Sequence, residues 1–163
     1  MSLRPMNLGD LDQVEAIDQA SFPTPWPKDA FLHELKHKTN GICKVAELLQ
    51  PGGKELIVGS IVIWLVLDEA HIATLAVRPG YRKRKIAQKL LAQSLLETYQ
   101  RGARQALLEV RETNLAAQNL YHKFGFEVVG VRRDYYKDTH EDALLMTLEA
   151  IDPQKLAQLG EGG

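Results

Sequence analysis

The segment Leu108–Phe126 reads LEVRETNLAAQNLYHKFGF and has the pattern of a strand, a turn and a helix. Glu109 lies among apolar residues near the end of the strand, Asn114 can cap the helix, and Tyr121 follows within that helix. Gly125 is placed to end it. A carboxylate, a carboxamide and a phenol spaced along such a unit can all face one cleft. This segment is therefore the candidate reaction site.

The rest of the chain divides into helices and strands of ordinary length. Apolar residues at helical spacing predict helices, and apolar runs between turn residues predict strands. The expected helices span about residues 10–20, 28–35, 83–101 and 114–124, and the expected strands about 42–49, 55–67, 70–77, 104–110, 126–133 and 142–148. This order predicts an α+β fold with a mixed sheet. Without a repeat or linker, we expect one domain over residues 1–150 and a short C-terminal tail over residues 151–163.

Composition excludes several classes of function. The 163 residues carry a net charge of −1, which gives no global attraction to DNA or to a membrane surface. The single cysteine, Cys43, cannot form an internal disulfide and lies in an apolar run, so we expect an inert core residue and a reducing compartment. The first ten residues lack the apolar stretch of a signal peptide, and Leu56–Leu67 is too short to span a bilayer. We expect a cytoplasmic protein.

The candidate segment resembles the acetyl-CoA-dependent N-acetyltransferases of the GNAT superfamily. Within it, the chain is most similar to the RimI-type enzymes, which acetylate the N-terminal alanine of a small-subunit ribosomal protein. Four further segments lie at positions where that family has similar short motifs, namely Phe22–Trp26, Asp68–Ile72, Leu75–Val77 and Arg132–Tyr136. The resemblance covers residues 4–148. It implies a central twisted sheet that splays between its fourth and fifth strands, here about 70–77 and 104–110, with acetyl-CoA in the gap.

The segment Val77–Ala87 corresponds to the family's phosphate loop but lacks its glycines. Arg82 and Ala87 match the family pattern, whereas Lys85 and Lys83 stand where relatives have glycine. A lysine with positive φ costs about 1–2 kcal/mol. Residues at a helix start usually have helical φ, so we expect both lysines to be unstrained and Lys85 to bind phosphate as a point charge. The alternatives are a solvated basic helix start and a contact with ribosomal RNA.

The resemblance also implies the remaining contacts of the donor. Backbone groups of the strand before the loop would pair with the pantetheine arm, and one N–H would polarise the thioester carbonyl. Asn114 would bond the same arm, an assignment that is compatible with its role as a helix cap. The full expected donor site comprises Leu75, Ala76, Val77, Arg82, Lys83, Arg84, Lys85, Ile86, Ala87, Gln88 and Asn114.

Glu109 and Tyr121 are the candidate catalytic residues. Acetyl transfer needs a base for the amine and an acid for the departing thiolate. We expect apolar neighbours to raise the pKa of Glu109 toward the working range of a base. Its alternative role is a salt bridge at the strand end, with Arg111 as a partner. Tyr121 is the expected acid, and its alternative role is a packed helix tyrosine.

The acceptor side is less distinct in the sequence. Aromatic residues that could line a peptide groove are Phe22, Trp26, Tyr135 and Tyr136, and each could equally be a core residue. His71 and His122 are expected to be structural, and the absence of a Cys/His cluster predicts no metal site. An α-amine has a pKa of about 7.7–8.0 and a lysine side chain about 10.4, so neutralising the α-amine costs about 3.4 kcal/mol less. A single glutamate base therefore favours a protein N-terminus.

Three functions compete at this point. The first is acetyl transfer from acetyl-CoA to the N-terminal alanine of a ribosomal protein by a monomeric enzyme. The second is an N-acetyltransferase of different or broader amine specificity. The third is a non-catalytic GNAT domain that binds the ribosome or its RNA through the basic loop. Glu109 and Tyr121 argue against the third, because a domain without turnover has no need of both.

Overall fold

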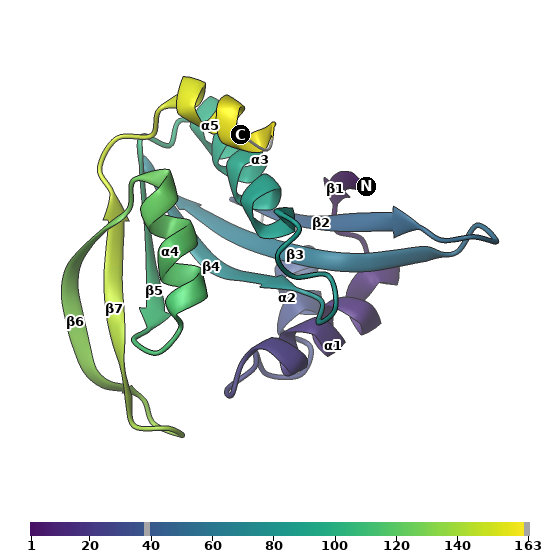
Figure 1. Cartoon of the computed structure of the whole chain (residues 1–163), viewed down its shortest axis with the longest axis horizontal. Coiled ribbons are helices and arrows are strands. Elements are labelled where there is room, and N and C mark those ends of the chain that lie inside the picture. The colour runs from purple at the N-terminus through teal and green to yellow at the C-terminus, as the bar shows by residue number, and fades with distance from the viewer. Residues whose placement is uncertain (38–39, 162–163) are drawn as a thin grey trace.

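The computed structural model describes residues 1–37 and 40–161 and shows a twisted seven-stranded sheet with helices on both faces (Figure 1). The strands are β1 (Ser2–Pro5), β2 (Gly41–Leu49), β3 (Glu55–Val66), β4 (Glu69–Val77), β5 (Gln105–Arg111), β6 (Glu127–Tyr136) and β7 (Glu141–Leu148). The helices are α1 (Leu11–Ser21), preceded by a 3-10 turn at Leu8–Asp10, α2 (Ala30–His37), α3 (Ile86–Gln100), α4 (Leu115–Phe124) and α5 (Pro153–Gly160).

The order of strands in the sheet is β1-β2-β3-β4-β5-β7-β6, and one pairing decides the architecture. All neighbours are antiparallel except β4 and β5, which pair in parallel only at their first residues, Glu69–His71 with Gln105–Leu107. Beyond His71 and Leu107 the two strands separate. The predicted mixed sheet with a splay between these strands is confirmed.

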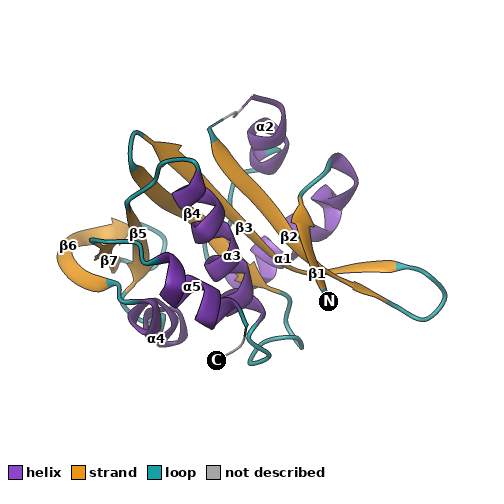
Figure 2. Cartoon of the chain, turned by 90° about the horizontal axis from the view of Figure 1, so that it is seen from above, coloured by secondary structure: helices purple, strands orange, loops and turns teal. Residues whose placement is uncertain are grey.

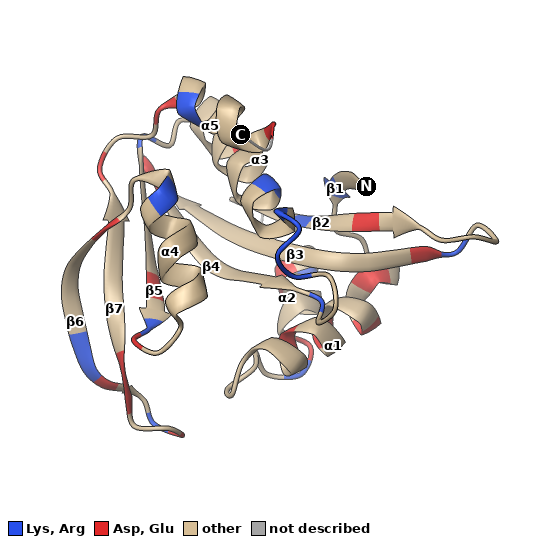
Figure 3. Ribbon diagram, in the orientation of Figure 1, with Lys and Arg blue, Asp and Glu red and all other residues tan. Residues whose placement is uncertain are grey.

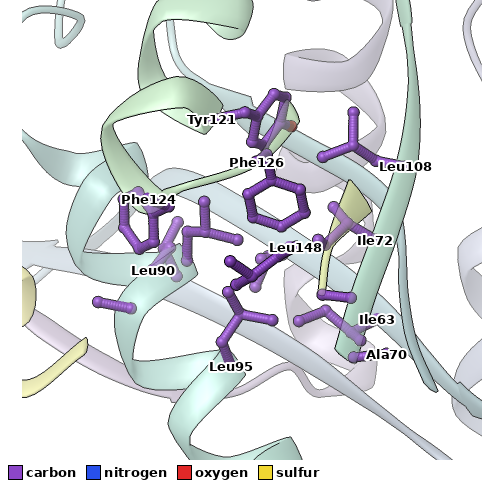
Figure 4. Close-up of a cluster of buried hydrophobic side chains, with 14 of the residues drawn as sticks. Ile63, Ala70, Ile72, Leu90, Leu95, Leu108, Tyr121, Phe124, Phe126 and Leu148 are labelled. Carbon is purple, nitrogen blue, oxygen red and sulfur yellow. The ribbon is translucent and has the colours of Figure 1, made fainter. Parts of the chain in front are cut away.

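The helices form two layers on opposite faces of the sheet. Helices α3, α4 and α5 cover one face, and α1 and α2 cover the other (Figure 2). The larger core lies under α3 and α4, where Tyr121, Phe124 and Phe126 pack with Leu90, Leu95 and residues of β4 and β5 (Figure 4). The C-terminal tail contains α5, and the leucines of this helix belong to the same core. No helix in the described ranges is both long and apolar enough to cross a bilayer.

Strand alternation decides which side chains face each layer. On β5, Leu108 and Val110 belong to the core under α3 and α4. Successive side chains of a strand point to opposite faces, so Glu109 points to the side of α1 and α2. On β4, Ile72 packs in the larger core and Ala73 against the smaller core of α1 and α2. The splay thus places polar residues of both strands on the α1–α2 side of one opening.

Two parts of the fold differ from expectation. Strand β1 was not predicted, because its four residues include only two apolar ones and are too few to show an alternating pattern. The strand pairs with β2, and its Arg4 side chain donates two hydrogen bonds to the Asp10 carboxylate, at 2.8 and 2.9 Å. Helix α3 begins at Ile86 rather than at residue 83. The reason is backbone conformation, since Lys83 and Lys85 both have positive φ and cannot continue a right-handed helix.

Candidate active site at the splay between two strands

A histidine and a glutamate meet where β4 and β5 separate. His71 Nε2 lies 2.8 Å from Glu109 Oε2, and both side chains are partly buried. Trp64 of β3 contacts the His71 ring edge-on, with ring centroids 5.3 Å apart. The hydrogen bond from His71 lowers the pKa of Glu109 and outweighs the effect of burial. The expected rise in the pKa of Glu109 was therefore wrong, and its partner is His71 rather than Arg111.

A cavity opens above Glu109 on the side of α1 and α2. The loop after α1 forms one wall, and the middle of β4, the ends of β5 and β6, and the first turns of α4 with its cap form the others. Its lining residues are Phe22, Thr24, Trp26, Ile72, Ala73, Thr74, Leu75, Glu109, Val110, Arg111, Asn114, Ala117, Tyr121 and Tyr136. Three of the four aromatic residues expected on the acceptor side thus line this cavity. Tyr135 does not line it; this ring is largely exposed, with the Arg132 guanidinium over it.

A second cavity continues from the first along β4 to the start of α3. The residues that line both are Phe22, Leu75, Asn114, Ala117 and Tyr121. The second cavity is further lined by Ser21, Ala76, Val77, Tyr81, Arg82, Lys83, Lys85, Ile86, Ala87, Gln88, Ala116 and Leu120. Ten of the eleven residues expected to hold the donor therefore lie around one hollow. The exception is Arg84, whose guanidinium stacks over Tyr81 at 5.0 Å.

The edge of β4 presents backbone groups to this second cavity. Arg78, directly after β4, donates its backbone N–H to Val58 O of β3. Every second residue of β4, counted back from Arg78, therefore directs its backbone N–H and C=O toward β3. By alternation, the backbone N–H and C=O groups of Leu75 and Val77 point the other way, into the gap beside β5. Val77 O already accepts a bond from Arg82 Nε at 3.1 Å. An extended arm with amide groups could pair with the remaining groups as an added strand does.

Lys83 and Lys85 are in the left-handed conformation, with φ of 63° and 61°. The expectation that both have helical φ was wrong. Helix α3 starts one residue after Lys85, and a left-handed residue there lets the chain turn sharply from the loop into the helix. Each such residue costs about 1–2 kcal/mol when it is not glycine. Figure 3 shows the loop that leads into α3 as a continuous cationic segment.

The residues that line the second cavity fit a ligand made of a diphosphate and an apolar arm. Three of its lining residues are cations, namely Arg82, Lys83 and Lys85, and they lie at the positive end of α3. Apolar side chains and the β4 edge line the remainder. Gln88 has a structural role in addition, because its side chain donates to Leu159 O at 2.8 Å and accepts from Lys123 Nζ at 2.9 Å.

Asn114 and Tyr121 lie at the junction of the two cavities. Asn114 Oδ1 caps α4 by accepting from Ala117 N at 3.2 Å, and the residue lines both cavities. The Tyr121 side chain is 7% exposed and packs against Phe126. Burial raises the pKa of Tyr121, so its phenol stays protonated across the physiological range.

Arg111 connects several elements around the first cavity and was considered in the sequence only as a partner of Glu109. This buried side chain donates to Thr139 Oγ1 at 2.9 Å and to Thr24 Oγ1 at 3.0 Å, and it lies 3.8 Å from the Tyr136 ring. Asp138 and Glu141 lie 3.7 and 3.5 Å away. The position of Arg111 at the end of a buried strand was the only sign in the sequence that this residue has a role. Its hydrogen-bond partners come from two loops that are distant in the sequence, and no local pattern connects them.

Cys43 agrees with its expected inert role. The thiol is partly buried beside the core of α1 and α2, and burial raises its pKa to about 11. A thiol with such a pKa is almost entirely protonated near neutrality and is a poor nucleophile.

Residues 11–126 match the model of the acetyltransferase (GNAT) family, a stretch that includes β4, the cationic loop, α3, β5 and α4. The chain belongs to the GNAT acetyltransferase family. It is an acetyl-CoA-dependent N-acetyltransferase. The GNAT match thus covers both walls of the splay and all residues that line the second cavity. From the roles expected in the sequence, we name the second cavity the donor cavity and the first the acceptor cavity.

Relatives and solved structures within the GNAT family are similar over nearly the whole chain. A Bacillus subtilis protein provisionally named a ribosomal protein bS18-alanine N-acetyltransferase is 39% identical over 89% of this chain and 93% of its own length. The Escherichia coli K12 bS18-alanine N-acetyltransferase is 33% identical over 85% and 90%. A crystal structure of the Escherichia coli ribosomal-protein-S18-alanine N-acetyltransferase superposes with a TM-score of 0.78 at 29% identity, covering 93% of this chain and 94% of that one.

Proposed function

We propose that this chain acetylates the N-terminal α-amine, most readily that of alanine, of a small-subunit ribosomal protein in the cytoplasm. The observation that carries the proposal is the likeness, over nearly the whole chain, to relatives named for that reaction. The geometry supports it, because the acceptor cavity is lined by an ionised carboxylate and by aromatic residues from the loop after α1 and the end of β6. An α-amine near neutrality needs less help to lose its proton than a lysine does.

Glu109 acts as the base in this proposal, with His71 behind it. Its lowered pKa keeps the carboxylate ionised, so it can hold the incoming ammonium and accept a proton as the nitrogen attacks. A carboxylate of low pKa is a weak base by itself. His71 does not line the acceptor cavity; its Nε2 lies 2.8 Å from Glu109 Oε2 and holds that carboxylate in place. We therefore assign base catalysis to Glu109 and positioning to His71.

The donor side supplies the remaining steps. The residues of the donor cavity would hold acetyl-CoA so that its acetyl thioester lies at the junction of the two cavities, beside Asn114 and Tyr121. The backbone N–H of Leu75, which faces the gap, can donate to the thioester carbonyl as charge develops on its oxygen. The amine nitrogen forms a bond to the carbonyl carbon and the C–S bond breaks. Tyr121 then gives the phenol proton to the leaving thiolate, and its buried, protonated state suits that role.

Two peptides test the acceptor class. One starts with Ala-Arg, has a free N-terminus and lacks lysine; the other has a blocked N-terminus and one internal lysine. Incubation with the protein and acetyl-CoA, followed by mass spectrometry, is expected to show acetyl transfer to the first peptide alone. Transfer to the lysine peptide at an equal rate would favour an enzyme of broader amine specificity. Calorimetry with CoA is the control for a folded donor site, and absence of binding would contradict an enzyme altogether.

A further inference from the structure

One wall of the acceptor cavity is a loop with few backbone donors. Residues 22–29 connect α1 to α2, and Phe22, Thr24 and Trp26 of this loop line the cavity. Three of the loop residues are prolines, which have no N–H to donate, and between the first and the last proline only Thr24 and Trp26 have one. Such a loop needs a restraint from another element if its side chains are to keep a fixed position.

A buried carboxylate at the end of α1 supplies that restraint. Asp18 Oδ2 accepts from the backbone N–H of Trp26 at 2.7 Å, and Asp18 O accepts from Phe22 N at 3.2 Å. A hydrogen bond to an ionised acceptor is about twice as strong as one between neutral groups. Asp18 is 3% exposed and lines neither the acceptor cavity nor the donor cavity. Any effect that Asp18 has on the acceptor therefore acts through the loop.

The burial of Asp18 is costly for the folded protein. Its second oxygen, Oδ1, is buried and has no hydrogen-bond partner among the residues that the structure describes. Burial also raises the pKa of this carboxyl, because a low-dielectric environment disfavours its charged form. An unpartnered buried polar atom lowers stability. A residue that breaks this rule is expected at a place where function requires it.

Ring contacts hold the side chain of Trp26 in addition. The indole stacks on Phe31 of α2, with ring centroids 4.7 Å apart, and on Trp64 of β3, at 6.3 Å. Trp64 is also the ring that contacts His71, the partner of Glu109. The Trp26 side chain is thus held by packing and its backbone by the carboxylate of α1. This series of rings ends at the pair that carries the proposed base.

We propose that Asp18 is a positioning residue for the acceptor: it holds the loop at Trp26, so that the indole is a fixed wall for the first residues of the acceptor peptide. Trp26 lines the acceptor cavity and not the donor cavity. Loss of the bond from Asp18 should therefore affect the peptide and leave CoA binding unchanged. This inference rests on the proposed function, since it assigns a role at the same acceptor site.

Three substitutions at Asp18 separate positioning from stability. Asp18→Ala removes the hydrogen-bond acceptor, Asp18→Leu removes it and fills the space, and Asp18→Asn keeps an uncharged oxygen that can accept. With the Ala-Arg peptide, Asp18→Ala and Asp18→Leu should raise KM about tenfold, the loss of one charge-assisted hydrogen bond, whereas kcat should change less than about threefold. Asp18→Asn should raise KM by no more than about threefold. CoA affinity by calorimetry should change less than about twofold in all three.

Thermal melts and a matched control exclude a purely structural role. Asp12→Asn removes an exposed carboxylate from the same helix and should match the parent in KM, kcat and Tm. All assays are made well below the lowest Tm. Asp18→Leu should keep Tm closer to that of the parent than Asp18→Ala does, because it leaves no cavity. A lower Tm in Asp18→Ala with an unchanged peptide KM in both Asp18→Ala and Asp18→Leu would overturn the inference.

Tryptophan fluorescence separates a failure of this inference from a failure of the proposed function. The chain has two tryptophans, so Trp64→Phe leaves Trp26 as the single reporter. In that background and without substrates, Asp18→Leu should increase acrylamide quenching of Trp26 about twofold, and Asp12→Asn should not change it. Unchanged quenching in Asp18→Leu would contradict the restraint on the loop. If the parent acetylates neither peptide, the proposed acceptor is wrong, and increased quenching would still support the restraint.

Discussion

His71 Nε2 and Glu109 Oε2 are 2.8 Å apart, and each residue comes from one of the two strands that separate at that point. The pair therefore joins the two halves of the sheet and carries the carboxylate that faces the acceptor. Glu109→Gln should lower kcat by about 10²–10⁴-fold, the usual contribution of general base catalysis, with CoA affinity changed less than about twofold. Steady-state kinetics with an Ala-Arg peptide and calorimetry with CoA measure the two quantities. Unchanged turnover would remove Glu109 from the role of base.

His71 should matter through Glu109. His71→Ala leaves the carboxylate without its partner, so we expect kcat to fall by about tenfold or more, as for a mispositioned catalytic group. In the Glu109→Gln background the same change should have little further effect, because residues that act as a unit are not additive. The matched control is His33→Gln on the exposed face of α2, which should leave kcat unchanged. Additive losses in the double variant would contradict the coupling.

The lowered pKa of Glu109 predicts how stability depends on pH. A carboxylate whose pKa is lower in the folded protein than its ordinary value of 4.5 adds stability that is full above that value. The contribution is lost as pH falls through the lower folded value. Denaturant unfolding of the protein and of Glu109→Gln should therefore differ at pH 7 and converge at acid pH. A constant difference from pH 7 to pH 3 would mean that the His71 bond does not lower this pKa.

Arg111 should stabilise the acceptor side rather than the donor side. It links the loop after α1 to the β6–β7 connection through Thr24 and Thr139. Arg111→Lys cannot reproduce both bonds together with the contact to Tyr136, so the free energy of unfolding should fall by about 1–3 kcal/mol. KM for the peptide should rise while CoA affinity holds. Arg133→Lys is the control: the Arg133 side chain, which pairs with Asp142, is highly exposed, so the change should alter stability by less than about 0.5 kcal/mol.

Tyr121 combines a packing role with the proposed acid role, and two variants separate them. Tyr121→Phe keeps the buried ring and loses the hydroxyl, so kcat should fall by about 10²-fold or more while stability stays close to that of the parent. Tyr121→Ala also empties part of the core and should cost about 3–5 kcal/mol of stability. The raised pKa predicts no loss of activity from ionisation of Tyr121 up to about pH 10. Equal turnover of Tyr121→Phe and the parent would assign the proton to another donor.

Much of the site could be predicted because its residues lie in one strand–turn–helix unit. Glu109, Asn114 and Tyr121 are ordered by local signals, namely an apolar strand, a helix cap and a helical spacing, and the structure brings all three to the cavities. Local signals of this kind do not predict which residues meet across the sheet. His71 reaches Glu109 only because two strands far apart in sequence pair in parallel for three residues and then separate.

The loop between β4 and α3 shows a different limit. Propensity favours helical φ for a lysine at a helix start, but the loop between β4 and α3 must reverse direction in few residues. The chain meets that demand with left-handed lysines, a choice decided by the ends of the loop and not by its own composition. Arg84 shows the same limit, because which cation of a run faces a cavity depends on these φ values.

The most direct test of the account measures the masses of the intact small-subunit ribosomal proteins from cells that have and lack this protein. The account predicts that one of them, starting with alanine after removal of its initiator methionine, loses a single acetyl group from its N-terminus when the protein is absent. It also predicts that the purified protein with acetyl-CoA restores that group, and that Glu109→Gln does not. Identical masses in both kinds of cell, or restored acetylation at a lysine, would contradict it.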